Sequence, residues 1–167
     1  MSALQAGVRA PEIKLNYLDS GRFVLTDVLK TGPVVAAFFK VSCPVCQYAF
    51  PYLERMFKAY GKSGKLTFVG ISQDDAEDTQ AFTREFGVTF PVLLDMEKEN
   101  YPVSNAYGLT NVPTVFMISA DGEIEFSCVS WSKPDMEELA RKLAELNGTL
   151  PRPLFLAGEK VAEFKPG

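Results

Sequence analysis

Two cysteines separated by two residues, Cys43 and Cys46, follow closely after an unbroken apolar run at residues 34–39. A run of this kind, without alternation, is typical of a strand that is covered on both faces. From residue 48 onward, large apolar side chains return every three or four positions, which predicts a helix from about residue 43 to residue 60. The cysteine pair is therefore expected where a buried strand turns into a helix, and this junction favours folds in which strands and helices alternate.

The expected position of the pair at a helix start has chemical consequences. The first N–H groups of a helix lack partners and the helix dipole is positive at this end, so both favour a thiolate over a thiol. Pro44 suits the first turn, because its missing N–H would be unpaired there in any case. Since the thiolate is the nucleophilic form, we expect redox chemistry. Cys43 is the predicted exposed nucleophile, and Cys46, one turn further on, is the predicted resolving thiol.

Other uses of the cysteines fit the sequence less well. The chain has three cysteines and no histidine, too few for the four nitrogen or sulfur ligands of a structural zinc site. A purely structural disulfide would not explain the strand-to-helix junction. Cys128 lies in an apolar segment and is expected to be a buried small residue rather than a third redox centre. Lys40 is either a solvated lysine or a cation that stabilises the Cys43 thiolate. We expect no metal and no cofactor.

Charge and hydropathy exclude several classes of partner. The 167 residues carry a net charge of −4 and no lysine- or arginine-rich run, so neither nucleic acid nor an anionic membrane surface is an expected partner. No apolar run approaches the roughly 20 residues of a membrane span. The first nine residues lack the basic and apolar regions of a secretory signal, which predicts a cytoplasmic protein; an exported form with its leader removed is the alternative.

Strands and helices are expected to alternate along the rest of the chain, giving an α/β domain with a central mixed sheet. An antiparallel hairpin is predicted over residues 10–25. Further strands are predicted at residues 66–71, 90–95, 114–118 and 123–129, and further helices at residues 73–86, 103–107 and 134–146. Residues 149–167 are rich in proline and glycine and are expected to extend along the surface. We therefore predict one domain over residues 1–148 and a C-terminal extension over residues 149–167.

Four segments carry a family resemblance: the strand, loop and helix start at residues 38–46, the proline at Pro51, the loop at residues 112–114, and the block at residues 86–95. In this order they resemble the thioredoxin superfamily, in particular its redoxin branch, which holds the TlpA- and ResA-like thiol-disulfide oxidoreductases and the AhpC/TSA-like peroxiredoxins. The resemblance covers about residues 7–147. It implies a thioredoxin-like three-layer fold with an N-terminal hairpin and the insertion that is typical of redoxins.

The resemblance also implies a substrate-binding surface beside the cysteines. Val112, Pro113 and Thr114 match the family's cis-proline loop, so the bond before Pro113 is expected to be cis, with Val112 facing a substrate backbone. Pro44 and Val45 would complete an uncharged groove. These residues are the predicted substrate-binding set.

The chain departs from the family at three positions near the redox pair. Ser42 stands where a tryptophan is usual, Ala37 where thioredoxins bury an aspartate, and Ala49 where ResA-like proteins carry a glutamate. Neither familiar acid is present to exchange a proton with Cys46. The proton acceptor is then water, Lys40 or a carboxylate from elsewhere. Asp74, Asp75, Glu77 and Asp78 are expected to form a solvated acidic face, and otherwise to repel or select partners.

Three functions remain. The preferred one is dithiol–disulfide exchange with protein or small-molecule disulfides, together with an unidentified redox partner. A thiol peroxidase is the first alternative, but the family pattern Pro-x-x-x-Thr-x-x-Cys is absent: Lys40 and Ala36 precede Cys43 at the two required positions, and Cys43 and Phe39 precede Cys46. A thioredoxin-fold module that binds without catalysis is the second.

Overall fold

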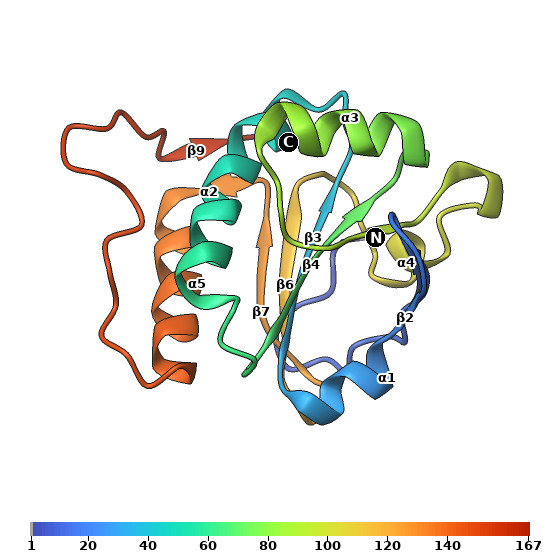
Figure 1. Ribbon diagram of the computed structural model, residues 1–167, viewed down its shortest axis with the longest axis horizontal. Helices are drawn as coiled ribbons and strands as arrows, with labels where there is room; N and C mark the ends of the chain where they lie inside the picture. The colour runs from blue at the N-terminus through green and yellow to red at the C-terminus, as the bar shows by residue number, and fades with distance from the viewer. Residues whose placement is uncertain (1) are drawn as a thin grey trace.

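The computed structural model describes residues 2–167 (Figure 1). The strands are β1 (Lys14–Tyr17), β2 (Arg22–Val24), β3 (Val34–Phe39), β4 (Thr67–Ser72), β5 (Val92–Leu94), β6 (Thr114–Ile118), β7 (Ile124–Val129), β8 (Trp131–Ser132) and β9 (Phe164–Lys165). The α-helices are α1 (Leu25–Val28), α2 (Pro44–Tyr60), α3 (Ala76–Phe86), α4 (Pro102–Ala106) and α5 (Lys133–Leu146). Two 3₁₀ helices are η1 (Leu29–Thr31) and η2 (Glu97–Glu99). The alternation of strands and helices is as predicted.

Seven strands form one mixed sheet in the order β2-β1-β5-β4-β3-β6-β7. The strand β3 lies near its middle, parallel to β4 and antiparallel to β6. The predicted hairpin is present as the antiparallel pair β1 and β2, although β1 is shorter than the segment predicted for it. The turn at Asp121 and Gly122 joins β6 to β7, which pair antiparallel as expected.

The sheet lies between two layers of helices. Two hydrophobic clusters form the core, one on each face of the sheet. Val35, Ala37 and Phe39 of β3 belong to the cluster that includes residues of α2, α3 and α5. The other three residues of β3 belong to the cluster that includes residues of α1 and α4. All six residues of β3 are buried, which explains why its sequence does not alternate. Figure 1 shows α2, α3 and α5 on the same side of the sheet. This is the three-layer arrangement that the resemblance implies.

Helix α3 begins later than predicted. Residues 73–75 are not helical, and Asp75 caps α3 by accepting a hydrogen bond from the N–H of Asp78. Gly87 ends the same helix with a left-handed backbone, as its position in the sequence suggests.

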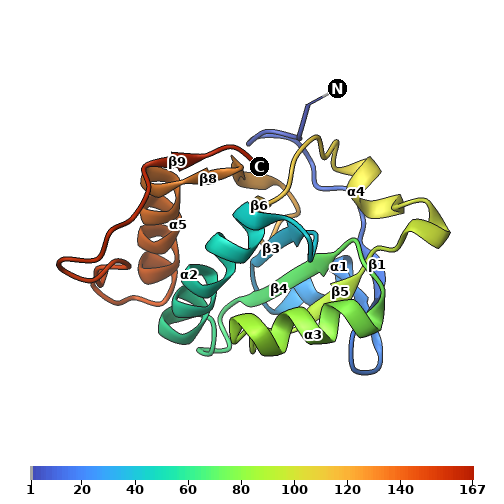
Figure 2. The same cartoon turned by 90° about the horizontal axis from the view of Figure 1, so that it is seen from above.

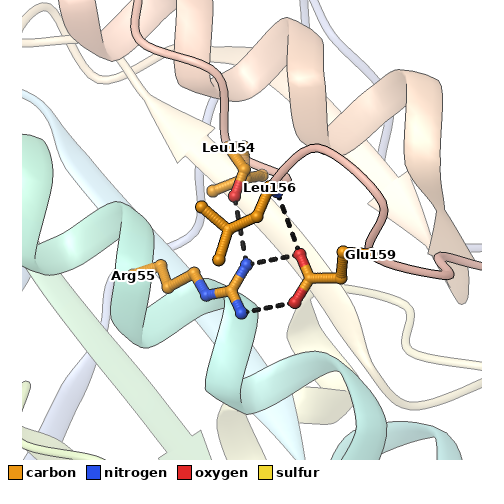
Figure 3. Close-up of polar contacts among 4 residues, drawn as sticks. All are labelled: Arg55, Leu154, Leu156 and Glu159. Atoms are coloured by element: carbon orange, nitrogen blue, oxygen red, sulfur yellow. Dashed lines mark hydrogen bonds and ion pairs between the residues drawn. The ribbon is translucent and has the colours of Figure 1, made fainter.

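Residues 149–167, called the C-terminal strap from here on, run back along α5 and α2 (Figures 1 and 2). The expected extended path along the surface is observed, and within it β9 pairs antiparallel with β8. Arg55 of α2 makes two hydrogen bonds with the carboxylate of Glu159, at 2.7 and 2.6 Å (Figure 3). The division into a domain at 1–148 and an extension at 149–167 stays a prediction. In the part of the chain that the structure describes, no helix is both long and apolar enough to cross a membrane.

Candidate active site

Cys43 is the residue from which α2 begins. Its backbone is extended, and its sulfur accepts a hydrogen bond from the N–H of Cys46 at 3.2 Å, so that the side chain caps the helix. Pro44 occupies the first turn of α2, as predicted. The Cys43 sulfur is half-buried and also donates a hydrogen bond to the carbonyl of Val112 at 3.4 Å. The predicted strand, loop and helix start is therefore confirmed, with the first cysteine at the helix N-terminus.

Cys46 lies beneath Cys43 in the core. Its side chain is fully buried, and burial is the main reason why the pKa of its thiol is raised above the ordinary value. A hydrogen bond with Cys43 raises the pKa further, whereas a hydrogen bond with the backbone of Lys40 lowers it. Cys46 is thus protonated at neutral pH and must lose its proton before it can act as a nucleophile.

The loop before β6 stands next to the two cysteines. The bond between Val112 and Pro113 is cis, which confirms the prediction. Val112 is half-buried, Pro113 is buried, and the hydroxyl of Thr114 donates to the carbonyl of Asn111 at 2.8 Å. The carbonyl of Val112 is the acceptor of the Cys43 thiol, so the structure brings this loop and the redox pair together.

Other predicted site residues lie around this centre. Pro44 is exposed and Val45 is half-buried. Lys40 is exposed, and its ammonium lies 5.9 Å from the centre of the Tyr101 ring. Lys40, Tyr101 and Val112 contribute to the walls of a cavity of roughly 400 Å³. Among residues 2–167 the hydrogen-bond partners of the Cys43 sulfur are Val112 and Cys46, so Lys40 borders the site without a hydrogen bond to this sulfur.

Asp74 corrects part of the predicted acidic face. Its neighbour Asp75 is exposed as expected, but Asp74 is half-buried and its carboxylate accepts the N–H of Val41 at 2.8 Å. The side-chain amide of Gln47 donates to the carbonyl of Val41 at 2.9 Å, so the backbone N–H and the carbonyl of Val41 are both hydrogen-bonded to side chains. The charge of Asp74 also contributes to the raised pKa of Cys46. The one signal for Asp74 in the sequence is its place two residues after a buried strand, at the edge that neighbouring parallel strands share, and its acidic neighbours have nearly the same place.

The remaining cysteine lies outside the redox pair. Cys128 of β7 is buried, as predicted, and its sulfur donates to the carbonyl of Ser130 at 3.6 Å. Burial raises the pKa of its thiol to about 12. A buried thiol of this kind is unreactive. Among residues 2–167 no group of three histidine, cysteine, aspartate or glutamate side chains is placed to hold a metal ion.

Known proteins share both the sequence and this architecture. The sequence model of the AhpC/TSA family matches residues 6–127. A thiol-disulfide oxidoreductase ResA from Geobacillus thermodenitrificans is 30% identical over 125 residues, which cover 74% of this chain and 69% of the relative. A solution structure of a Bacteroides thetaiotaomicron protein aligns with a TM-score of 0.79 at 22% identity, covering 87% of this chain and 94% of that one. The thioredoxin domain of a thiol-disulfide oxidoreductase from Bacteroides vulgatus aligns with a TM-score of 0.73 at 23% identity, covering 84% and 98%. The thioredoxin-like fold is thereby confirmed.

Proposed function

The chain belongs to the AhpC/TSA family, and from this we propose that it is a thiol-disulfide oxidoreductase that works through Cys43 and Cys46. The observation that carries the proposal is the position of the Cys43 sulfur, which accepts the N–H of Cys46 at the start of α2. An N–H donor and the positive end of a helix both stabilise a thiolate at this atom. Cys46 lies one turn behind it and has no access to solvent.

The reaction begins at Cys43. Its thiolate attacks one sulfur of a substrate disulfide, the S–S bond of the substrate breaks, and the second substrate sulfur leaves as a thiolate that takes up a proton. A mixed disulfide then joins Cys43 to the substrate. Cys46 loses its proton and attacks the Cys43 sulfur, which releases the second substrate thiol and leaves a disulfide between Cys43 and Cys46. The substrate gains two electrons from the protein and two protons from solvent, to which the ionisation of Cys43 and that of Cys46 each release one; the reverse sequence oxidises a dithiol.

The residues around the pair hold the substrate. We assign this part to the predicted set, Pro44, Val45, Val112, Pro113 and Thr114, because Val112 and the Cys43 sulfur are already in contact. The substrate would be a protein or a small molecule with a disulfide, and a second redox partner would restore the starting state. The cytoplasmic location stays a prediction, and fractionation of the source cells tests it.

Exchange with insulin disulfides tests the function. We expect the reduced protein to cleave them, the Cys43→Ser variant to lose the activity, and the Cys46→Ser variant to accumulate a mixed disulfide at Cys43 that gel electrophoresis without reductant detects. A Cys43→Ser variant with full activity would contradict the assignment. Catalytic consumption of peroxide without insulin cleavage would favour a peroxidase instead.

A Lys40→Met variant tests thiolate stabilisation by Lys40, through the pH dependence of alkylation at Cys43.

A further inference from the structure

The last residues of the C-terminal strap lie on the loop that faces Cys43. We infer that residues 164–167 occupy the place of a substrate polypeptide, and that they must move away before a polypeptide disulfide can reach Cys43. The inference rests on the proposed function and adds two statements to it: the substrate is an extended polypeptide, and the protein carries its own competitor for the site.

Gly167 touches the substrate-binding loop directly. Its N–H donates to the hydroxyl of Ser130 at 3.0 Å, and its carbonyl accepts the side-chain amide of Asn111 at 2.8 Å. A β-carbon on Gly167 would lie 2.0 Å from the carbonyl oxygen of Val112. This carbonyl also accepts the Cys43 thiol. The strap thus ends in contact with an atom that the nucleophilic sulfur itself contacts.

The strap reaches this point as an extended strand. Its residues Phe164–Lys165 form β9 and pair antiparallel with β8, and the N–H of Lys133 donates to the carbonyl of Glu163 at 2.9 Å. An extended peptide that binds by strand addition needs free backbone groups on such an edge. At β8 these groups already pair with the strap, and Figure 2 shows β9 beside β8. A polypeptide that approaches along this edge therefore meets an occupied position.

The strap is held unevenly along its length. Its middle is anchored by the pair of Arg55 and Glu159 (Figure 3) and by Ala162, whose N–H donates to the Tyr48 hydroxyl at 3.0 Å and whose carbonyl accepts the indole N–H of Trp131 at 2.7 Å. Residues 164–167 bury little apolar surface, because Phe164 is 60% exposed and Lys165 is half-buried, with its ammonium 4.9 Å from the centre of the Tyr48 ring. A segment with few buried apolar contacts opens locally at low cost, so residues 164–167 can move off the site while the middle of the strap stays attached.

The Gly167→Val variant displaces the end of the strap, because no side chain fits between this residue and Val112. We expect kcat/KM for insulin reduction to rise at least about fivefold, the factor given by the loss of one of the two hydrogen bonds of Gly167 at about 1 kcal/mol each. A small aromatic disulfide, which needs no strand addition, should change less than about twofold by the same reasoning. Lys160→Ala, at an exposed strap residue, is the matched control and should behave as wild type. Glu159→Gln loosens the middle anchor and should act in the same direction as Gly167→Val.

A second readout does not depend on catalysis. Cys46 and Cys128 are buried, so a bulky maleimide labels Cys43 first, and its rate should rise in Gly167→Val and Glu159→Gln but not in Lys160→Ala. Unchanged labelling and unchanged insulin reduction in both variants would overturn the inference. An equal gain for insulin and the small disulfide would overturn it too, because the effect would then lie in the chemistry of Cys43. If even the wild type fails to reduce insulin, the proposed function is wrong, and the labelling rates alone decide whether the strap covers the site.

Discussion

Replacing Asp74 by asparagine separates two parts that a carboxylate near the redox pair can play. Asp74 accepts the N–H of Val41 in the loop before Cys43, and its charge helps to raise the pKa of Cys46. No hydrogen bond joins Asp74 to the Cys46 sulfur among residues 2–167. We therefore expect Asp74 to hold the loop before Cys43 in place and, through its charge, to keep Cys46 protonated. We do not expect it to be the base that receives the Cys46 proton.

The two interpretations predict opposite changes in rate. Without the negative charge the pKa of Cys46 falls, and each unit of that fall gives tenfold more thiolate but a less nucleophilic one, so the attack accelerates about threefold. If Asp74 were the general base, asparagine would instead slow the attack by about 10² to 10⁴. The amide oxygen can still accept the Val41 N–H, whereas Asp74→Ala removes the acceptor and should cost about 1.5–3 kcal/mol of stability.

The assay isolates the second half of the reaction. A small chromogenic thiol is attached to Cys43 as a mixed disulfide, and its release by Cys46 is followed in a single turnover at pH 7 in the wild type, Asp74→Asn and Asp75→Asn. Asp75 is exposed and caps α3, so its variant controls for the loss of a nearby charge. Urea unfolding of each variant provides the stability. A slower release in Asp74→Asn, with unchanged stability, would refute the reasoning and identify the base.

Three further predictions concern stability. The free energy of unfolding of the reduced protein should fall above about pH 9, by about 1.4 kcal/mol per pH unit for each of Cys46 and Cys128. The reason is that the unfolded chain releases these two thiol protons in this range, whereas the folded protein retains them. Urea titrations at pH 8 to 10 measure the fall, and Cys128→Ala should reduce its slope. Glu54→Gln should lower the free energy of unfolding by about 2–3 kcal/mol, because the buried carboxylate accepts two backbone N–H groups and a hydroxyl. Glu138→Gln, at a surface position, should leave this free energy unchanged, and equal losses in the two variants would contradict the prediction. Gly70→Ala should cost about 1–3 kcal/mol by overpacking, since its β-carbon would lie 3.1 Å from the Phe90 ring; an unchanged melting temperature would show that the ring can move.

Features that depend on neighbours in the sequence were predictable. The junction of β3 and α2 follows from an apolar run, a helical period and Pro44, all within residues 34–60. The start of α5 at Lys133 and the turn before β7 likewise carry local signals. The cis bond at Pro113 came from the resemblance to a family rather than from composition, because most prolines follow a trans bond.

Features that depend on distant partners were not predictable. Glu159 meets Arg55 across 104 positions, and the proline-rich composition of the strap indicates only that no helix forms there. The partner strand β9 has two residues, too few to carry a period. Asp74 belongs to a run of similar acidic residues, and only its place at the end of β4 distinguishes it from Asp75. In each case the decisive contact lies outside the window over which a pattern can be read.

The Cys43 sulfur, which caps α2, is also the atom that forms a disulfide in the proposed reaction. When Cys43 enters a disulfide, its sulfur can no longer become a thiolate, which is the strongest acceptor it can be, and the N–H of Cys46 loses much of its partner. The first turn of α2 should therefore fray more easily in the oxidised protein than in the reduced one. Amide hydrogen exchange at Cys46 would then report the redox state directly, faster after oxidation, while the amides of the later turns serve as an internal reference.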